Sequence, residues 1–275
     1  MTDVFKSVDD LSEGYYKLID ARFSLSDPEA GRKAYEEGHI AGAVYWDLEK
    51  DMSDMASDRG RHPMPSREQL EELFRRSGLS LNDRILIYDG GGEPFAARAY
   101  FLLRYGGFTQ AFILKEGFDG LRTAGYPVDA EPCRPQVSDV NPDWQEHLLA
   151  SREDVKDVSQ GREKGVLLDA RAAERYLGRH EPLDPVAGHI PGARNFDWTL
   201  LKKEGYFDTG ETAEQSLRGT VAGDEKVTVY CGSGVTAAPL FAMLDHIGQE
   251  NLRLYVGSYS DWVSDPDNPV EKENG

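Results

Sequence analysis

Cysteine is scarce in this chain of 275 residues, which has only Cys133 and Cys231. Two cysteines cannot form a disulfide framework, and the lack of a Cys-x-x-Cys pair excludes zinc ribbons and thioredoxin-type redox centres. The six histidines show no metal-ligand spacing. We therefore expect no metal site and no organic cofactor, and we expect a protein of a reducing compartment, the cytoplasm.

Long apolar runs and an excess of basic residues are also missing. The apolar stretches are far shorter than the roughly 20 residues needed to cross a bilayer. Residues 1–25 lack the basic head and apolar core of a secretory signal. Lysine and arginine number 31 against 49 aspartates and glutamates, so the formal net charge is −18. Such a charge disfavours polyanions as partners, and we expect neither nucleic-acid nor membrane binding.

The sequence contains an internal repeat. Both copies carry an Asp-Ala-Arg element, then Gly-His-Ile-x-Gly-Ala, then a short apolar run. The matching segments are 18–22 with 167–171, 38–43 with 188–193, and 85–90 with 227–232. A period of about 150 residues is too long for a solenoid, so it predicts two similar globular domains.

The chain between the two copies is polar and rich in proline, which is typical of a linker. We expect an N-terminal domain over 1–127, a linker over 128–143 and a C-terminal domain over 144–275. Within each copy, short β-rich runs alternate with helical patterns, such as a strand at 227–230 followed by a helix at 237–247. This alternation predicts an α/β fold in which each domain has a mostly parallel sheet with helices on both faces.

Cys231 is the residue best suited to carry chemistry, because it ends a predicted strand and opens the segment Cys-Gly-Ser-Gly-Val-Thr. A cysteine beside a strand is most often a buried, inert hydrophobe. Here the two glycines let backbone N–H groups converge into an anion nest at a helix N-terminus, which would stabilise a thiolate. Ligands of parallel sheets bind beyond the carboxyl ends of strands, where both Cys231 and its counterpart Asp89 fall.

Two chemistries use a cysteine in such a nest. Phosphatases require Cys-x5-Arg, whose arginine grips the phosphate, and Ala237 stands at that position here. The lack of this arginine therefore argues against phosphate and arsenate chemistry. Sulfur transfer, in which the thiolate holds a sulfur atom as a persulfide, is the interpretation that the loop favours.

These motifs, together with the segment 257–262, resemble the tandem-domain rhodanese-like sulfurtransferases over nearly the whole chain. The resemblance implies a catalytically silent first domain, in agreement with Asp89, and a second domain that carries the catalytic cysteine. Members that prefer thiosulfate carry an Arg-Lys pair after the cysteine, where this chain has the uncharged Gly232 and Ser233. The loop looks like that of the 3-mercaptopyruvate sulfurtransferases, and thiosulfate remains the alternative donor.

The resemblance also assigns catalytic roles to individual residues. Cys231 would be the nucleophile, and Ser233 would handle the proton at the leaving enolate. His62 lies in a segment that resembles the first-domain loop reaching the active site. Its accompanying acid would be Glu49 or Asp51, and the spacing does not decide between them. The structural alternatives are a Ser233 that only stabilises the loop and a His62 that is merely solvated.

The substrate carboxylate would bind Arg171 and Arg175, which match the two arginines of the corresponding family segment. Because they lie four apart, we expect them to share one face of a helical turn. The alternative for both is a structural ion pair or simple exposure. The negative sulfur would be held by backbone N–H groups of the loop residues Gly232, Gly234, Val235 and Thr236.

The expected partners are a small-molecule sulfur donor and a thiol acceptor such as thioredoxin, or cyanide in the test tube. Two other functions stay open. Rhodanese-like domains without a working cysteine serve as binding modules, although an intact loop at Cys231 argues against this for the second copy. A persulfide carrier fed by a partner protein would have little use for Arg171 and Arg175 as a carboxylate clamp.

Overall fold

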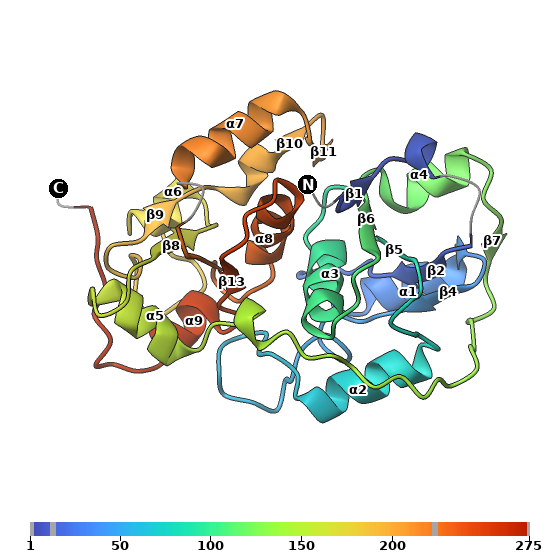
Figure 1. Ribbon diagram of the computed structural model, residues 1–275, viewed down its shortest axis with the longest axis horizontal. Coiled ribbons are helices and arrows are strands. Elements are labelled where there is room, and N and C mark those ends of the chain that lie inside the picture. The colour runs from blue at the N-terminus through green and yellow to red at the C-terminus, as the bar shows by residue number, and fades with distance from the viewer. Residues whose placement is uncertain (1–2, 12–14, 222–224, 274–275) are drawn as a thin grey trace.

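The computed structural model describes residues 3–11, 15–221 and 225–273. Figure 1 shows two α/β units side by side, the N-terminal half of the chain in one and the C-terminal half in the other. Each unit is built on a parallel sheet flanked by helices, which confirms the predicted fold class. Within the described residues, no helix is long and apolar enough to span a membrane.

The sheet of the first unit has the strand order β1-β6-β5-β2-β4, and all of its neighbours pair in parallel. Its strands are β1 (Phe5–Lys6), β2 (Lys17–Asp20), β4 (Ala43–Tyr45), β5 (Ile85–Tyr88) and β6 (Ala111–Leu114). The helices of this unit are α1 (Ala30–Glu37), α2 (Arg67–Arg76), α3 (Phe95–Tyr105) and α4 (Gly117–Thr123). Along β5, Ile85 and Ile87 pack in a core with α2 and α3, whereas Leu86 and Tyr88 pack with α4 on the opposite face.

The second unit repeats this plan with the strand order β13-β12-β8-β9. Its strands are β8 (Val166–Asp169), β9 (Arg194–Asn195), β12 (Val227–Tyr230) and β13 (Leu252–Leu254), with a small antiparallel pair, β10 (Lys202–Lys203) and β11 (Tyr206–Phe207). Its helices are α5 (Arg152–Ser159), α6 (Ala173–Tyr176), α7 (Glu211–Thr220), α8 (Ala237–His246) and α9 (Ser258–Trp262). Short 3-10 turns lie at Val8–Asp10, Glu146–Leu148 and Trp198–Leu201. Helices α7 and α8 cover one face of the sheet, and α5 and α9 cover the other.

The segment between the units follows the surface of the first unit. It begins with β7 (Val128–Asp129), which pairs antiparallel with β3 (His39–Ile40). Farther along, the Ser138 hydroxyl donates to the Leu79 carbonyl at 2.6 Å. These contacts tie the connecting segment to the first unit before the chain enters the second.

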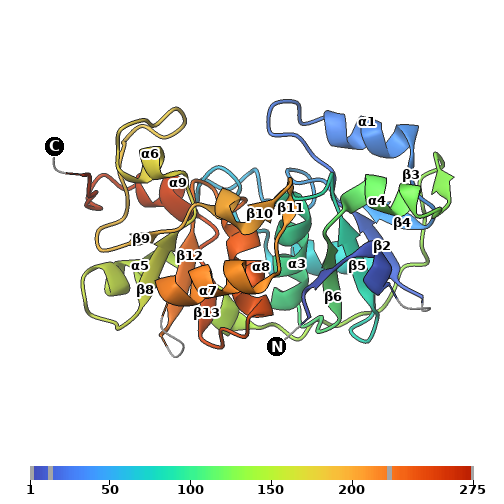
Figure 2. The same ribbon diagram turned by 90° about the horizontal axis from the view of Figure 1, so that it is seen from above.

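Helices α3 and α8 pack against each other where the two units meet (Figures 1 and 2). Both are dominated by apolar residues, and the rings of Phe101 and Phe241 meet edge to face with centroids 5.1 Å apart. Beside them, Asp245 accepts hydrogen bonds from the Tyr100 hydroxyl at 2.6 Å and from Arg104 Nε at 3.0 Å. One buried apolar core therefore runs from unit to unit, and it fixes the first-unit loops against the Cys231 loop.

Candidate active site

Cys231 follows β12 at its carboxyl end, and the loop 231–236 leads from it into α8. The loop rests on the segment before α9: the Ser258 hydroxyl accepts from the Cys231 N–H at 3.1 Å, and Tyr259 N–H donates to the Cys231 carbonyl at 3.0 Å. Gly234 has a φ of +73°, and a Cβ there would lie 2.3 Å from the Val256 oxygen, so only glycine fits. Ser258 also has a positive φ of 56°, a strained conformation that places its hydroxyl against this loop.

The Cys231 thiol is free and almost completely buried, with 1% of the residue exposed. The Gly234 N–H donates to Sγ at 3.1 Å, and the Ser258 hydroxyl lies 4.0 Å from Sγ. Among the described residues, Gly234 supplies the loop N–H that reaches the sulfur at hydrogen-bond distance; Gly232, Val235 and Thr236 share the loop without such a contact. One loop N–H therefore contacts the sulfur of the resting thiol, and the roles expected of Gly232, Val235 and Thr236 stay predictions.

His62 reaches this loop from the first unit. Its Nδ1 lies 3.0 Å from the Ser233 hydroxyl, and its Nε2 lies 3.9 Å from a Glu49 oxygen. Asp51, the other acid considered, accepts from the Asp47 N–H at 2.8 Å and pairs with a different basic residue. The geometry thus brings Ser233, His62 and Glu49 into one row across the boundary between the units.

His62 is neutral at pH 7. Burial, followed by the positive charges of Arg98 and Arg61, lowers the pKa of His62 to about 4. With its proton on Nε2, facing Glu49, the imidazole leaves Nδ1 free to accept the Ser233 proton. The pair can then move a proton to or from a group bound beside Cys231.

Arg171 is held by the second unit itself. Its guanidinium bonds Asp169 at 2.6 Å and the Gly188 carbonyl at 2.8 Å, and its side chain is 1% exposed. Arg22 bonds Asp20 at 2.6 Å and the Gly38 carbonyl at 2.7 Å in the first copy, where no catalytic cysteine is present. The repeated arrangement matches the structural ion pair that was the alternative for Arg171, and its contact with substrate stays a prediction.

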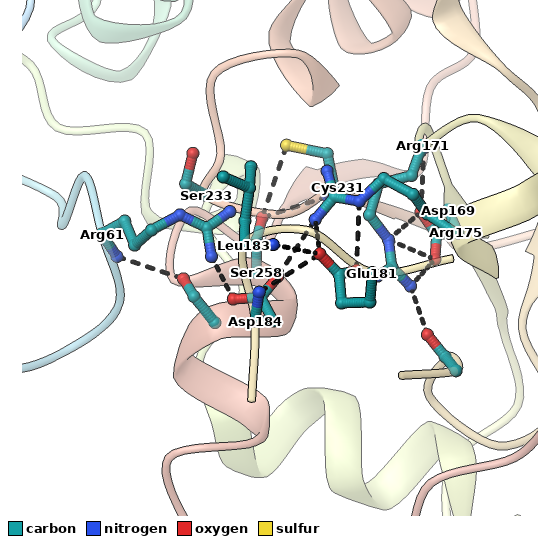
Figure 3. Close-up of polar contacts among 12 residues, drawn as sticks. Arg61, Asp169, Arg171, Arg175, Glu181, Leu183, Asp184, Cys231, Ser233 and Ser258 are labelled. Atoms are coloured by element: carbon teal, nitrogen blue, oxygen red, sulfur yellow. Dashed lines mark hydrogen bonds and ion pairs between the residues drawn. The ribbon is translucent and has the colours of Figure 1, made fainter. Parts of the chain in front are cut away.

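Arg175 lies closer to the thiol loop. Figure 3 shows Arg61, Arg175 and Asp184 grouped beside Cys231. A Cβ placed on Gly232 would lie 2.6 Å from Arg61 and 3.3 Å from Arg175, so both guanidiniums border the loop. The expectation that Arg171 and Arg175 share a helical face was wrong, because Arg171 precedes α6 and only Arg175 lies on it.

Two acids neutralise these arginines. Asp184 pairs with Arg61 and, at 3.1 Å, with Arg175; Glu181 bonds Arg175 at 2.7 Å and Arg171 at 3.2 Å. Both carboxylates are buried, with side chains 2% exposed. Burial raises the pKa of Asp184, whereas hydrogen bonds led by that from Arg175 outweigh burial and hold the pKa of Glu181 below its ordinary value.

Sequence reasoning missed Arg61, Glu181 and Asp184. Arg61 adjoins His62 in the first-domain loop, and that adjacency was the available signal. The two acids carried no recognisable pattern, because they meet the arginines only after a loop closes around Arg175. The structure describes no cluster of three or more potential metal ligands within the residues that it covers.

The counterpart loop in the first unit is closed around a carboxylate. Asp89 is buried and accepts from the Gly91 N–H at 2.8 Å and the Ala96 N–H at 3.0 Å. Burial raises the pKa of Asp89 to about 7. The N–H groups that could have held a ligand are therefore satisfied by the chain's own side chain, which has no sulfur to transfer.

Comparisons with known proteins agree with this geometry. A family model described as "Rhodanese-like domain" matches residues 6–124 and again 151–265. SseB of Mycobacterium tuberculosis, named as a thiosulfate sulfurtransferase, is 39% identical over 92% of this chain and 89% of its own. The 3-mercaptopyruvate sulfurtransferase of Escherichia coli K12 is 32% identical over 93% of this chain and 92% of its own.

A solved structure gives the same result. The crystal structure of SseA from Escherichia coli, described as a 3-mercaptopyruvate sulfotransferase, aligns with a TM-score of 0.80 at 29% identity. The alignment covers 94% of this chain and 100% of that one. With two tandem family matches over most of its length and relatives above 30% identity that span it almost completely, the chain belongs to the tandem-domain rhodanese-like sulfurtransferases.

Proposed function

We propose that this sulfurtransferase takes sulfur from 3-mercaptopyruvate, holds it as a Cys231 persulfide and passes it to a thiol acceptor such as reduced thioredoxin. The observation that carries the proposal is the row Ser233, His62 and Glu49 beside a thiol that accepts the Gly234 N–H. This row is suited to proton transfer, and mercaptopyruvate is the donor that needs it.

In the first step, the Cys231 thiolate attacks the donor sulfur, so that a sulfur–sulfur bond forms and the carbon–sulfur bond breaks. The electron pair of that bond leaves on pyruvate as its enolate. The donor's S–H proton passes through Ser233 and His62 to the enolate carbon, which yields pyruvate and an ionised persulfide. No oxidant, metal or organic cofactor enters the balance.

Sulfur transfer from thiosulfate does not need this proton transfer. Attack on its outer sulfur expels sulfite directly, and no proton has to be placed on a carbon atom. The 3.0 Å contact between His62 and Ser233 would then have no catalytic task. The proton row therefore favours mercaptopyruvate over thiosulfate.

The donor's carboxylate would bind at Arg175 and Arg61, which border Gly232. Asp184 already occupies these guanidiniums, so the incoming carboxylate has to replace it. Arginine binds carboxylates through paired hydrogen bonds, so one anion can substitute for another with little change in geometry. The Gly234 N–H would hold the negative sulfur before and after transfer.

In the second step, an acceptor thiolate attacks the outer sulfur and releases the Cys231 thiolate. The products are an acceptor persulfide and the free enzyme, so the cycle closes without other reactants. Such chemistry requires reduced thiols, and the two free cysteines fit it; a cytoplasmic location is part of the proposal.

Intact mass measured after mixing with mercaptopyruvate tests the proposal. We expect a gain of one sulfur atom on the peptide that contains Cys231, together with pyruvate. Cys231→Ser should show neither, and Cys133→Ser, a change at the other free cysteine, should behave as wild type. If neither mercaptopyruvate nor thiosulfate adds mass, the proposal is wrong, and a binding module or a carrier fed by a partner protein takes its place.

Thiosulfate is the second candidate donor, because SseB of Mycobacterium tuberculosis is named for it. A comparison of kcat/KM for the two donors under one set of conditions decides between them. A larger value for mercaptopyruvate supports the first candidate, and a larger value for thiosulfate overturns it.

A further inference from the structure

Arg98, near the start of α3, is charged and yet completely buried. Arg104, farther along the same helix, pairs with Asp245, and Arg171, which is also buried, pairs with Asp169. In the part of the chain that the structure describes, the hydrogen-bond acceptors of Arg98 are backbone carbonyls and none is a carboxylate. A buried cation without an anion is costly, so the position calls for a functional explanation.

The hydrogen bonds of Arg98 converge on the active site from both units. Within the first unit, Arg98 donates to the Met52 carbonyl at 2.9 Å and to the His62 carbonyl at 3.3 Å. Across the boundary, its Nη1 donates to the Gly234 carbonyl at 3.3 Å. Gly234 is the residue whose N–H holds the Cys231 sulfur, so Arg98 fixes both the proton-transfer loop and the sulfur-binding loop.

Gly234 connects Arg98 to the Cys231 sulfur, because its carbonyl accepts from Arg98 Nη1 at 3.3 Å and its N–H donates to Sγ at 3.1 Å. Burial lowers the pKa of Arg98 to about 10, so it remains a cation at pH 7, and the charge of Cys231 opposes that lowering. Arg98 also contributes, after burial, to the lowered pKa of His62. Because Arg98 and Cys231 are both buried, an interaction between their charges is screened far less than one at the surface.

We propose that Arg98 is a positioning residue through which the silent first domain supplies the counter-charge of the Cys231 thiolate and holds the Gly234 loop in its sulfur-binding shape. The inference rests on the proposed function only in taking Cys231 as the nucleophile. It gives the first domain a task that a lone second domain could not perform. Leu240, which lies as far after Cys231 as Arg98 lies after Asp89, has no charge to offer.

The test is a thiolate titration that needs no sulfur donor. The ultraviolet absorbance of the Cys231 thiolate is followed against pH in the Cys133→Ser background, with the Cys133→Ser, Cys231→Ser double variant subtracted. Arg98→Gln keeps hydrogen-bond donors without the charge, and we expect its midpoint to move to higher pH than in wild type, the direction in which loss of a nearby opposite charge shifts a thiol. Arg98→Lys keeps the charge and should remain close to wild type.

Arg104→Gln is the matched control, because it removes a half-buried arginine of the same helix at the same boundary. It should leave the midpoint unchanged even where it lowers stability, which circular dichroism and thermal unfolding measure in parallel. A wild-type midpoint near about 8.5, the value of an ordinary thiol, overturns the proposal without any variant. So does an Arg98→Gln midpoint equal to that of wild type. Pyruvate release is scored separately, so failure of the proposed donor chemistry is distinguishable from failure of this inference.

Discussion

The imidazole of His62 lies 3.0 Å from the Ser233 hydroxyl, although the two residues are 171 positions apart and belong to different units. The contact exists because α3 and α8 pack into one core and hold the first-unit loop over the thiol loop. Neither domain alone contains both partners. In the proposed reaction, the second copy therefore carries the nucleophile and the first copy supplies groups around it.

The proton row should separate the two donors. Ser233→Ala and His62→Gln should each lower kcat for mercaptopyruvate by about 10²-fold or more, because general acid–base catalysis is lost. The kcat for thiosulfate should change little, because its leaving sulfite needs no proton on carbon. Steady-state kinetics with both donors measure this. The control is Ser77→Ala, which removes a buried hydroxyl that is bonded to Trp46 and takes no part in the proton row. Equal losses of kcat with both donors in Ser233→Ala or His62→Gln would contradict the role of the row.

His62 should also make the fold sensitive to acid. Its pKa is about 4 in the folded chain against about 6.5 in an unfolded one, so the unfolded state binds more protons between these values. Stability is therefore complete above about pH 6.5 and falls as the pH decreases toward 4, by on the order of 3 kcal/mol at most. Urea unfolding at several pH values measures this. His62→Gln should lose less stability over the window; a parallel decline in both proteins would show that other groups are responsible.

Local sequence patterns predicted the architecture well, because strands and helices depend on residues that are close together in the sequence. The apolar runs and caps placed β12 at Val227–Tyr230 and α8 at Ala237–His246, close to the expected bounds. The repeat placed Cys231 at the end of its strand. Contacts made by loops were beyond such patterns. The choice of Glu49 over Asp51 depends on how the loops of the first unit fold, and the pairing of Asp184 with Arg61 depends on how the two units dock. These contacts join residues whose spacing in the sequence carries no periodic signal.

The two arginines of the second unit should differ in what they support. Arg171→Met leaves Asp169 buried without its partner and should cost about 3–5 kcal/mol of unfolding free energy. Arg175→Met should cost less stability and raise KM for mercaptopyruvate, because Arg175 borders the sulfur loop. Urea unfolding and steady-state kinetics separate these effects. Arg22→Met repeats the Arg171 change in the silent copy; a KM increase confined to Arg171→Met would restore that residue to the substrate site.

Asp184 should set the affinity of the site for anionic donors. Its carboxylate pairs with Arg61 and Arg175, so Asp184→Asn frees Arg61 and removes one of the two acids that pair with Arg175, the other being Glu181. A hydrogen bond to a charged group contributes about 1.5–3 kcal/mol, so KM should fall roughly tenfold, and farther for the dianion thiosulfate than for the monoanion mercaptopyruvate. The matched control is Glu163→Gln, because Glu163 also bridges two cations, Lys226 and Arg253, away from the thiol. If KM rises for both donors in Asp184→Asn alone, the carboxylate holds the arginines in place for substrate and does not compete with it.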